Sequence, residues 1–247
     1  MSVRALASLV KNLDSLYECS DICRIQLLSK DKAIKIFVND AFDTAKFILK
    51  INVLKVEGDA EDLSCTCDIK KLTKNLKNNK ITPMKVNIIH DTSISFNDAN
   101  NSENIFEEQK NIDLAQTESN IEKFPEENNY IPIIMQMADL SNIVINLCIL
   151  DGFAEFKTDE KLKKIFFFSK SAIADIVIEK QLAVPFLPEF KTTVITKILK
   201  IVTHAFNGPK TINLHIPTIP ELPLKLSVSP DEKSSLNLFL FDQQKFL

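Results

Sequence analysis

The five cysteines come closer than any other residues of this chain to a metal-binding pattern. They stand at positions 19, 23, 65, 67 and 148, and form one CxC element and one Cx3C element. A structural zinc site usually pairs CxxC-type elements with further Cys or His at set spacing. No such partner follows here, so we expect small buried or partly buried thiols and no metal. An odd count is typical of reduced thiols in the cytosol or nucleus.

Catalytic chemistry would need a base beside a nucleophile, a carboxylate pair in a cleft, or a glycine-rich cofactor loop. The three His (90, 204 and 215) stand beside no GxSxG-type motif. The acidic clusters at 59–62, 107–108 and 126–127 fall in expected turns and a connector. Gly58, Gly152 and Gly208 are too far apart to cradle a phosphate or a dinucleotide. We therefore expect no catalytic residue and no cofactor. A small-molecule enzyme on an α+β fold is the least favoured alternative.

The composition allows a sizeable core but does not by itself indicate a nucleic-acid partner. The 247 residues are 45% hydrophobic and 26% charged, and the formal net charge is -3. Any binding of DNA must therefore come from how charge is distributed. The sequence has no secretory-type start and no apolar run of membrane-spanning length, so we expect no membrane association.

The chain repeats one architecture four times: a strand, a helix and three further strands. In the first half the units are expected at 1–5, 7–17, 22–29, 33–39 and 45–53, and at 62–67, 69–78, 84–90, 92–97 and 104–112. In the second half they are expected at 130–137, 139–148, 153–158, 164–170 and 172–179, and at 184–190, 192–206, 211–216, 222–229 and 235–241.

Residues 115–129 are polar, acidic and carry Pro125, as is typical of a connector. The sequence thus predicts an N-terminal domain over 1–114 and a C-terminal domain over 130–247. The predicted fold class is α+β, with two similar domains that each pack two helices on antiparallel sheets.

The polar faces of the expected helices carry the functional signal. In the second helix an apolar stripe of Ile69, Leu72 and Leu76 opposes lysines spaced i, i+4 and i+7. The fourth and first helices also expose basic residues, whereas the third has none. The basic candidates are Lys11, Lys70, Lys74, Lys77, Lys197, Lys200 and His204. A basic helix layer on an acidic body suits phosphate contact without sequence reading, although each stripe alone could be an ordinary solvated face.

Several stretches resemble the PCNA sliding clamps. PEENNYIPIIMQMADLSNIVINL (125–147) resembles the clamp segment that leaves the interdomain connector and enters the third helix. KNIDLAQTES (110–119) resembles the start of that connector. LPEFKTTVITKILKIVTHAF (187–206) resembles the last inner helix with its preceding strand, and LPLKLSVSPDEKSSLNLFLF (222–241) resembles the closing hairpin.

The resemblance implies a nuclear homotrimeric ring around double-stranded DNA, with the helices lining the hole. Such a ring is a processivity factor in DNA replication and repair, and binds DNA polymerase, the clamp loader and other clamp-binding proteins. By position, edge strands within 102–110 and 171–180 would join the subunits, and partners would dock at Ile112, Leu114, Ile121 and Asp242. The missing basic residue in the third helix keeps a second reading open, namely one subunit of the heterotrimeric DNA-damage checkpoint clamp.

Overall fold

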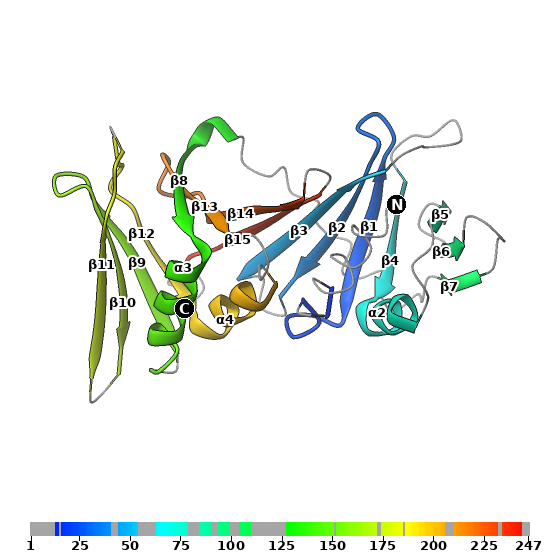
Figure 1. Ribbon diagram of the computed structural model, residues 1–247, viewed down its shortest axis with the longest axis horizontal. Helices are drawn as coiled ribbons and strands as arrows, with labels where there is room; N and C mark the ends of the chain where they lie inside the picture. Colours follow the sequence, from blue (N-terminus) through cyan, green and yellow to red (C-terminus); the bar gives the residue numbers. More distant parts are fainter. Residues whose placement is uncertain are drawn as a thin grey trace. The chain divides into compact units, whose positions relative to one another are not determined.

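The chain is described from a computed structural model (Figure 1). The description covers residues 13–14, 16–40, 44–53, 63–78, 84–89, 93–98, 104–109, 127–150, 152–171, 174–184, 186–205, 210–231 and 234–243. Lys11, Ile112, Leu114 and Ile121 lie outside these ranges, as does most of the predicted connector.

The first half of the chain contains seven strands and one full helix within the described ranges. Residues 13, 14 and 16 are also helical, inside the range predicted for the first helix. The elements that follow are β1 Ile22–Leu28, β2 Ala33–Asn39, β3 Ala45–Asn52, β4 Leu63–Asp68, α2 Ile69–Asn78, β5 Met84–Ile89, β6 Ser93–Asp98 and β7 Asn104–Gln109.

The second half opens with a short 3-10 helix, η2, at Glu127–Asn129. It continues with β8 Tyr130–Gln136, α3 Met137–Leu147, β9 Phe153–Asp159, β10 Lys164–Lys170, β11 Asp175–Gln181, β12 Lys191–Ile195, α4 Thr196–Ala205, β13 Thr211–Pro217, β14 Leu224–Asp231 and β15 Ser234–Leu240. The order strand, helix, three strands therefore occurs in full three times, and the predicted α+β class is confirmed. The opening strand expected at 1–5 lies outside the described residues.

The prediction for the strand before the last helix was wrong. A strand was expected at 184–190, but β12 is Lys191–Ile195 and α4 begins only at Thr196. Pro185 and Pro188 cannot donate to a sheet ladder, which disfavours the predicted range. The β-branched run from Thr192 to Ile195 instead pairs antiparallel with β9. Val194 and Ile195 thus belong to the strand and not to the apolar face of the helix.

The chain divides into two units. The longest segment of the first unit is Phe47–Lys123, and the longest segment of the second is Phe124–Val228. In the first unit the sheet order is β4-β1-β2-β3, with a second sheet β5-β6-β7; α2 lies against β4 and β7. In the second unit the orders are β15-β14-β13-β8 and β11-β10-β9-β12, and α3 and α4 pack side by side (Figure 1). Every strand pair whose register is defined is antiparallel. The exact domain bounds remain a prediction.

Alternation of side chains along the strands builds the core of each unit. In β10, Ile165, Phe167 and Ser169 are buried while their neighbours are less so. The Phe167 ring meets Phe156 of β9 edge to face, with centroids 5.0 Å apart. Full burial of such a side chain stabilises the fold by about 2 kcal/mol. This alternation is the physical basis of the strand predictions.

Two turns at equivalent places in the two halves share one geometry. Lys32, after β1, and Lys163, after β9, have φ of 48° and 51°. The carbonyl of Lys32 accepts a hydrogen bond from the N–H of Val53 (2.8 Å), and that of Lys163 accepts one from Leu182 (2.9 Å). Left-handed backbone is uncommon outside glycine, so its recurrence at matched positions supports the internal repeat.

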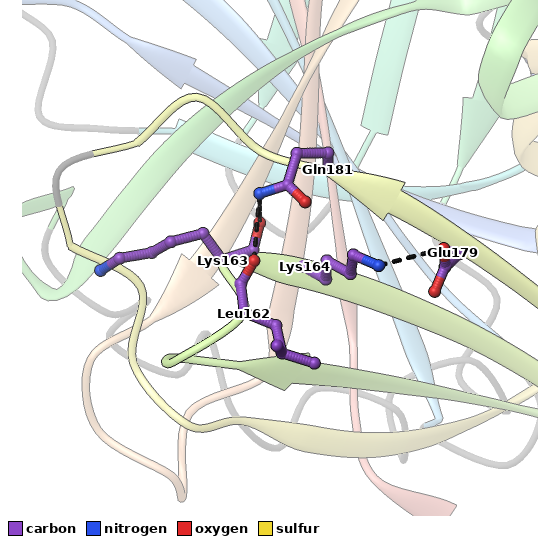
Figure 2. A network of polar contacts seen from close by, with 5 residues as sticks. All are labelled: Leu162, Lys163, Lys164, Glu179 and Gln181. Carbon is purple, nitrogen blue, oxygen red and sulfur yellow. Dashed lines mark hydrogen bonds and ion pairs between the residues drawn. The ribbon is translucent and has the colours of Figure 1, made fainter.

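Side chains hold the second of these turns in place (Figure 2). The Gln181 amide donates to the carbonyls of Leu162 and Lys163, at 3.0 Å and 3.2 Å. Lys164 pairs with Glu179 across β10 and β11 at 3.1 Å. The end of β11 is thereby fixed to the turn that precedes β10.

Candidate nucleic-acid interface

The α2 helix presents the clearest basic face. Asp68 caps the helix, because its Oδ1 accepts a hydrogen bond from the N–H of Lys71 at 2.8 Å. The apolar stripe predicted from the sequence, Ile69, Leu72 and Leu76, is buried. The three predicted lysines, Lys70, Lys74 and Lys77, are exposed along the other side.

The α4 helix repeats the arrangement. Ile198, Leu199 and Ile201 are buried, and Lys197 and Lys200 are exposed. The hydroxyl and the N–H of Thr196 both donate hydrogen bonds to the carbonyl of Gly152 at 3.0 Å, which fixes the start of the helix. His204 lies in the helix, but its side chain is not among those described. Thr193, inside the range predicted for this helix, instead lies in β12 and is buried.

The α3 helix differs from both. It contains no Lys or Arg, and its exposed positions include Asn142, Ile145 and Asn146. The side chain of Ile145 is 64% exposed. Asp139 in the first turn is held by Lys180 of β11. The third helix therefore has no basic face in the structure, as expected from the sequence. The negative charge of Asp139 is paired with the positive charge of Lys180.

The segment before β1 adds an acid and an aromatic ring beside α2. Asp14 Oδ1 lies 2.7 Å from Lys77 Nζ. Lys70 Nζ lies 5.6 Å from the ring centroid of Tyr17. Asp14, Tyr17, Lys70, Thr73, Lys74 and Lys77 together line a pocket of about 290 Å³. Sequence spacing predicted the lysines but not this pocket, because its walls come from segments more than fifty residues apart.

Of the predicted partner-binding residues, only Asp242 can be placed. It follows β15 and is half-buried, and its carboxylate accepts a hydrogen bond from the N–H of Thr193 at 3.0 Å. Phe241 beside it donates its N–H to the carbonyl of Thr44 at 2.9 Å and lies under Lys46, whose Nζ is 5.3 Å from the ring centroid. Asp242 thus anchors the chain after β15 to the middle of β12.

None of the five cysteines forms a disulfide. Cys23 and Cys67 face each other across β1 and β4, with both side chains buried and their sulfur atoms 3.4 Å apart. Among the residues that the structure describes, no group of three or more His, Cys, Asp or Glu could hold a metal ion. None of the helices within those ranges is long and apolar enough to cross a membrane.

Comparison with solved structures defines the class of fold. The repeated order of one strand, one helix and three strands, with antiparallel sheets, is the clamp fold. The structure is similar to the crystal structure of proliferating cellular nuclear antigen from Entamoeba histolytica, with a TM-score of 0.70 and 15% sequence identity. The match covers 96% of this chain and 95% of that chain. At that identity the likeness shows the fold, and at this level the resemblance seen in the sequence is confirmed. No protein-family model and no curated protein matches the sequence.

A cluster of polar side chains packs around Tyr130 and His215 in the C-terminal unit. His215 Nε2 lies 2.6 Å from the hydroxyl of Ser227, and the Tyr130 hydroxyl donates to the carbonyl of Pro223 at 3.1 Å. Lys225 is nearly buried, and its Nζ lies about 6 Å from the Tyr130 ring and 3.6 Å from Glu127. Burial raises the pKa of Tyr130 to about 12. Burial and the charge of Lys225 lower the pKa of His215 to about 4, against a smaller opposing effect of Glu127.

This histidine makes stability depend on pH. The folded pKa of His215 lies below the value of about 6.5 expected in the unfolded chain, so the unfolded state binds the proton first. The free energy of unfolding should therefore fall as the pH drops from about 6.5 towards 4, by about 1–2 kcal/mol once partial solvent exposure is allowed for. Urea unfolding at several pH values should show a shallower dependence for His215→Gln. Equal dependence in both proteins would contradict this assignment.

Proposed function

We propose that this chain is a subunit of a sliding clamp that encircles double-stranded DNA and serves as a DNA polymerase processivity factor in replication and repair. The observation that carries the proposal is the clamp fold over nearly the whole chain, with exposed lysines on α2 and α4. In such a ring the helices line the hole, and the body of the protein carries no catalytic residues. The proposed setting is the nucleus.

The DNA contact in this proposal is electrostatic and independent of base sequence. Lys70, Lys74 and Lys77 of α2 and Lys197 and Lys200 of α4 would meet the phosphate backbone, and Lys11 and His204 would extend these faces. Lysine side chains that neutralise phosphates release counterions, which gives salt-sensitive binding without base readout. Weak contacts of this kind permit sliding, and closure of the ring keeps the protein on the DNA.

Subunits would join through strand edges. Within the described residues β7 ends one sheet of the first unit and β11 ends one sheet of the second. Pairing of β7 with β11 of the next copy would cover two edges that otherwise invite aggregation. A homotrimer is the primary proposal. The bare α3 face favours a second candidate, a subunit of the heterotrimeric DNA-damage checkpoint clamp, in which other chains would supply the missing positive charge.

The solution mass of the purified chain separates the two assemblies. Three chains of 28.0 kDa make 84 kDa, and light scattering behind size exclusion should report a mass near that value for a self-closing ring. A mass near 28 kDa at micromolar concentration, with and without duplex DNA, would contradict the homotrimer and direct the search to partner chains.

The partner site is proposed at the connector. Ile112, Leu114 and Ile121, with Asp242 at the border, would receive a peptide from a DNA polymerase, clamp loader or other clamp-binding protein. Ile112→Asp with Leu114→Asp should abolish binding of a clamp-interaction peptide containing a Gln and paired aromatics, because a charge cannot replace an apolar contact. Calorimetry is the measurement. Ile219→Asp, at a 41% exposed position in the turn before β14, is the control. Unchanged affinity in the double variant would move the site elsewhere.

A further inference from the structure

The pocket beside α2 has the chemistry of a site for one phosphate group. Lys70, Lys74 and Lys77 stand at i, i+4 and i+7, so their ammonium groups share one face of the helix. The volume of about 290 Å³ has room for a phosphate together with several waters. Three lysines against one carboxylate, Asp14, leave the walls with net positive charge.

A buried hydroxyl in this pocket lacks a partner. Thr73 lies on the same helix face and lines the pocket, and its residue is 4% exposed. Its Oγ1 is buried and makes no hydrogen bond. A threonine inside a helix usually donates to the carbonyl four residues earlier, and an unpaired buried hydroxyl costs free energy. Such a group calls for a ligand or an ordered water that completes it.

Two of the three lysines have a partner within the pocket, and the third does not. Lys70 is placed over the Tyr17 ring, and Lys77 is held by Asp14. Within the described ranges no acidic side chain pairs with Lys74, the lysine one position from Thr73. A phosphate in the pocket would bind Lys74 and the Thr73 hydroxyl directly. It would bind Lys77 only after the ion pair between Lys77 and Asp14 breaks. Asp14 therefore sets the affinity of the pocket, since its carboxylate competes with the anion for Lys77.

We propose that this pocket is an oxyanion site that seats a single phosphate group between Lys70, Lys74 and Lys77, with Thr73 donating a hydrogen bond and Asp14 acting as the competing internal anion. The inference deepens the proposed function and rests on it only for the source of the phosphate. A backbone phosphate of duplex DNA and a free phosphate ion offer the same oxygens. If the pocket binds one phosphate, α2 would contact DNA at one defined place. The alternative is a diffuse attraction spread over the basic face of the helix.

The first test uses inorganic phosphate on the full chain, at constant ionic strength with chloride as the reference anion. Amide NMR shifts of Lys70, Thr73 and Lys74 should saturate with phosphate. Thr73→Val should weaken binding about tenfold, because it removes a hydrogen bond to a charged group, and Thr73→Ser should retain it. Asp14→Asn should strengthen binding roughly threefold by removing the exposed competing charge. Thr192→Val is the matched control, since Thr192 is also buried with an unpaired hydroxyl but lies in β12.

The second test uses a short duplex and identifies the source. If the pocket takes a backbone phosphate, inorganic phosphate and duplex compete there and Thr73→Val weakens both. If it takes free phosphate, Thr73→Val weakens only phosphate binding. Either result supports the oxyanion site. Absence of saturable shifts, or equal phosphate affinity in Thr73→Val and Thr192→Val, overturns it. That failure would leave lysine-dependent duplex binding, and hence the proposed function, untouched. Phosphate binding at the pocket without any duplex binding would instead overturn the proposed function alone.

Discussion

Removing the five exposed lysines Lys70, Lys74, Lys77, Lys197 and Lys200 as alanine variants should weaken binding to a duplex of arbitrary sequence by roughly 10- to 100-fold near 0.1 M salt. Each lysine that neutralises a phosphate contributes about 0.9 to the slope of log affinity against log salt. The slope should therefore become shallower by up to about 4–5 per subunit. Fluorescence anisotropy across a salt series measures both quantities.

The control for this variant removes the same charge from other surfaces. The control removes exposed lysines that lie in strands and turns and not in helices: Lys30, Lys85, Lys157, Lys161 and Lys170. Alanine at all five should leave the affinity within about threefold, since the loss would then come only from net charge acting over a screened distance. If the two variants lose affinity equally, overall charge governs binding and the helix faces do not form the interface.

Charging the exposed edge of β11 should dissolve the assembly without unfolding the subunit. Val177 is 57% exposed, and β11 pairs with β10 on one side only, within the described residues. In a ring, Val177 would face a residue of the neighbouring copy across the strand pair. Val177→Glu would then bury an unpaired charge at each junction, and the junction affinity should fall at least 100-fold, about 3 kcal/mol.

Light scattering at micromolar concentration tests this, with thermal unfolding as the check on the fold. The mass should move from near 84 kDa, three chains of 28.0 kDa, to near 28 kDa. The melting temperature of the subunit should change by no more than about 2 °C, because surface substitutions usually cost little. Ile134→Glu on β8, at a position 75% exposed, is the matched control and should leave the mass unchanged. A Val177→Glu protein that keeps its mass would exclude β11 as the junction.

How far the sequence predicts this fold depends on the local signal of each element. The bounds of α2 were predicted to the residue, because Ile69, Leu72 and Leu76 mark a clear period and Asp68 provides the cap. At β12 the local signal is ambiguous. The stretch from Thr192 to Ile195 is β-branched, yet it runs directly into a helix with the same apolar spacing. Pairing with β9 decides the boundary there, and that pairing is a tertiary contact.

The candidate interface divides in the same way. Exposure of the lysines follows from helix period alone and was predicted. The unpaired hydroxyl of Thr73, the approach of Asp14 to Lys77, and the hold of Lys180 on Asp139 each join segments that are distant in sequence or depend on packing. No periodicity in one sequence carries that information. At 15% identity to the solved structure that it resembles, the chain shares the fold and few of the residues themselves.

Retention on DNA tests the central claim, encirclement, most directly. The purified chain would be allowed to enter a bead-attached duplex over its free end, which is then either blocked by a bulky protein or left open. At about 0.5 M salt, where purely electrostatic contacts weaken strongly, the protein should remain on the blocked duplex and leave the open one. Cutting the blocked duplex should release it at once. Equal loss from blocked and open duplexes would show that the protein binds the surface of DNA and does not surround it.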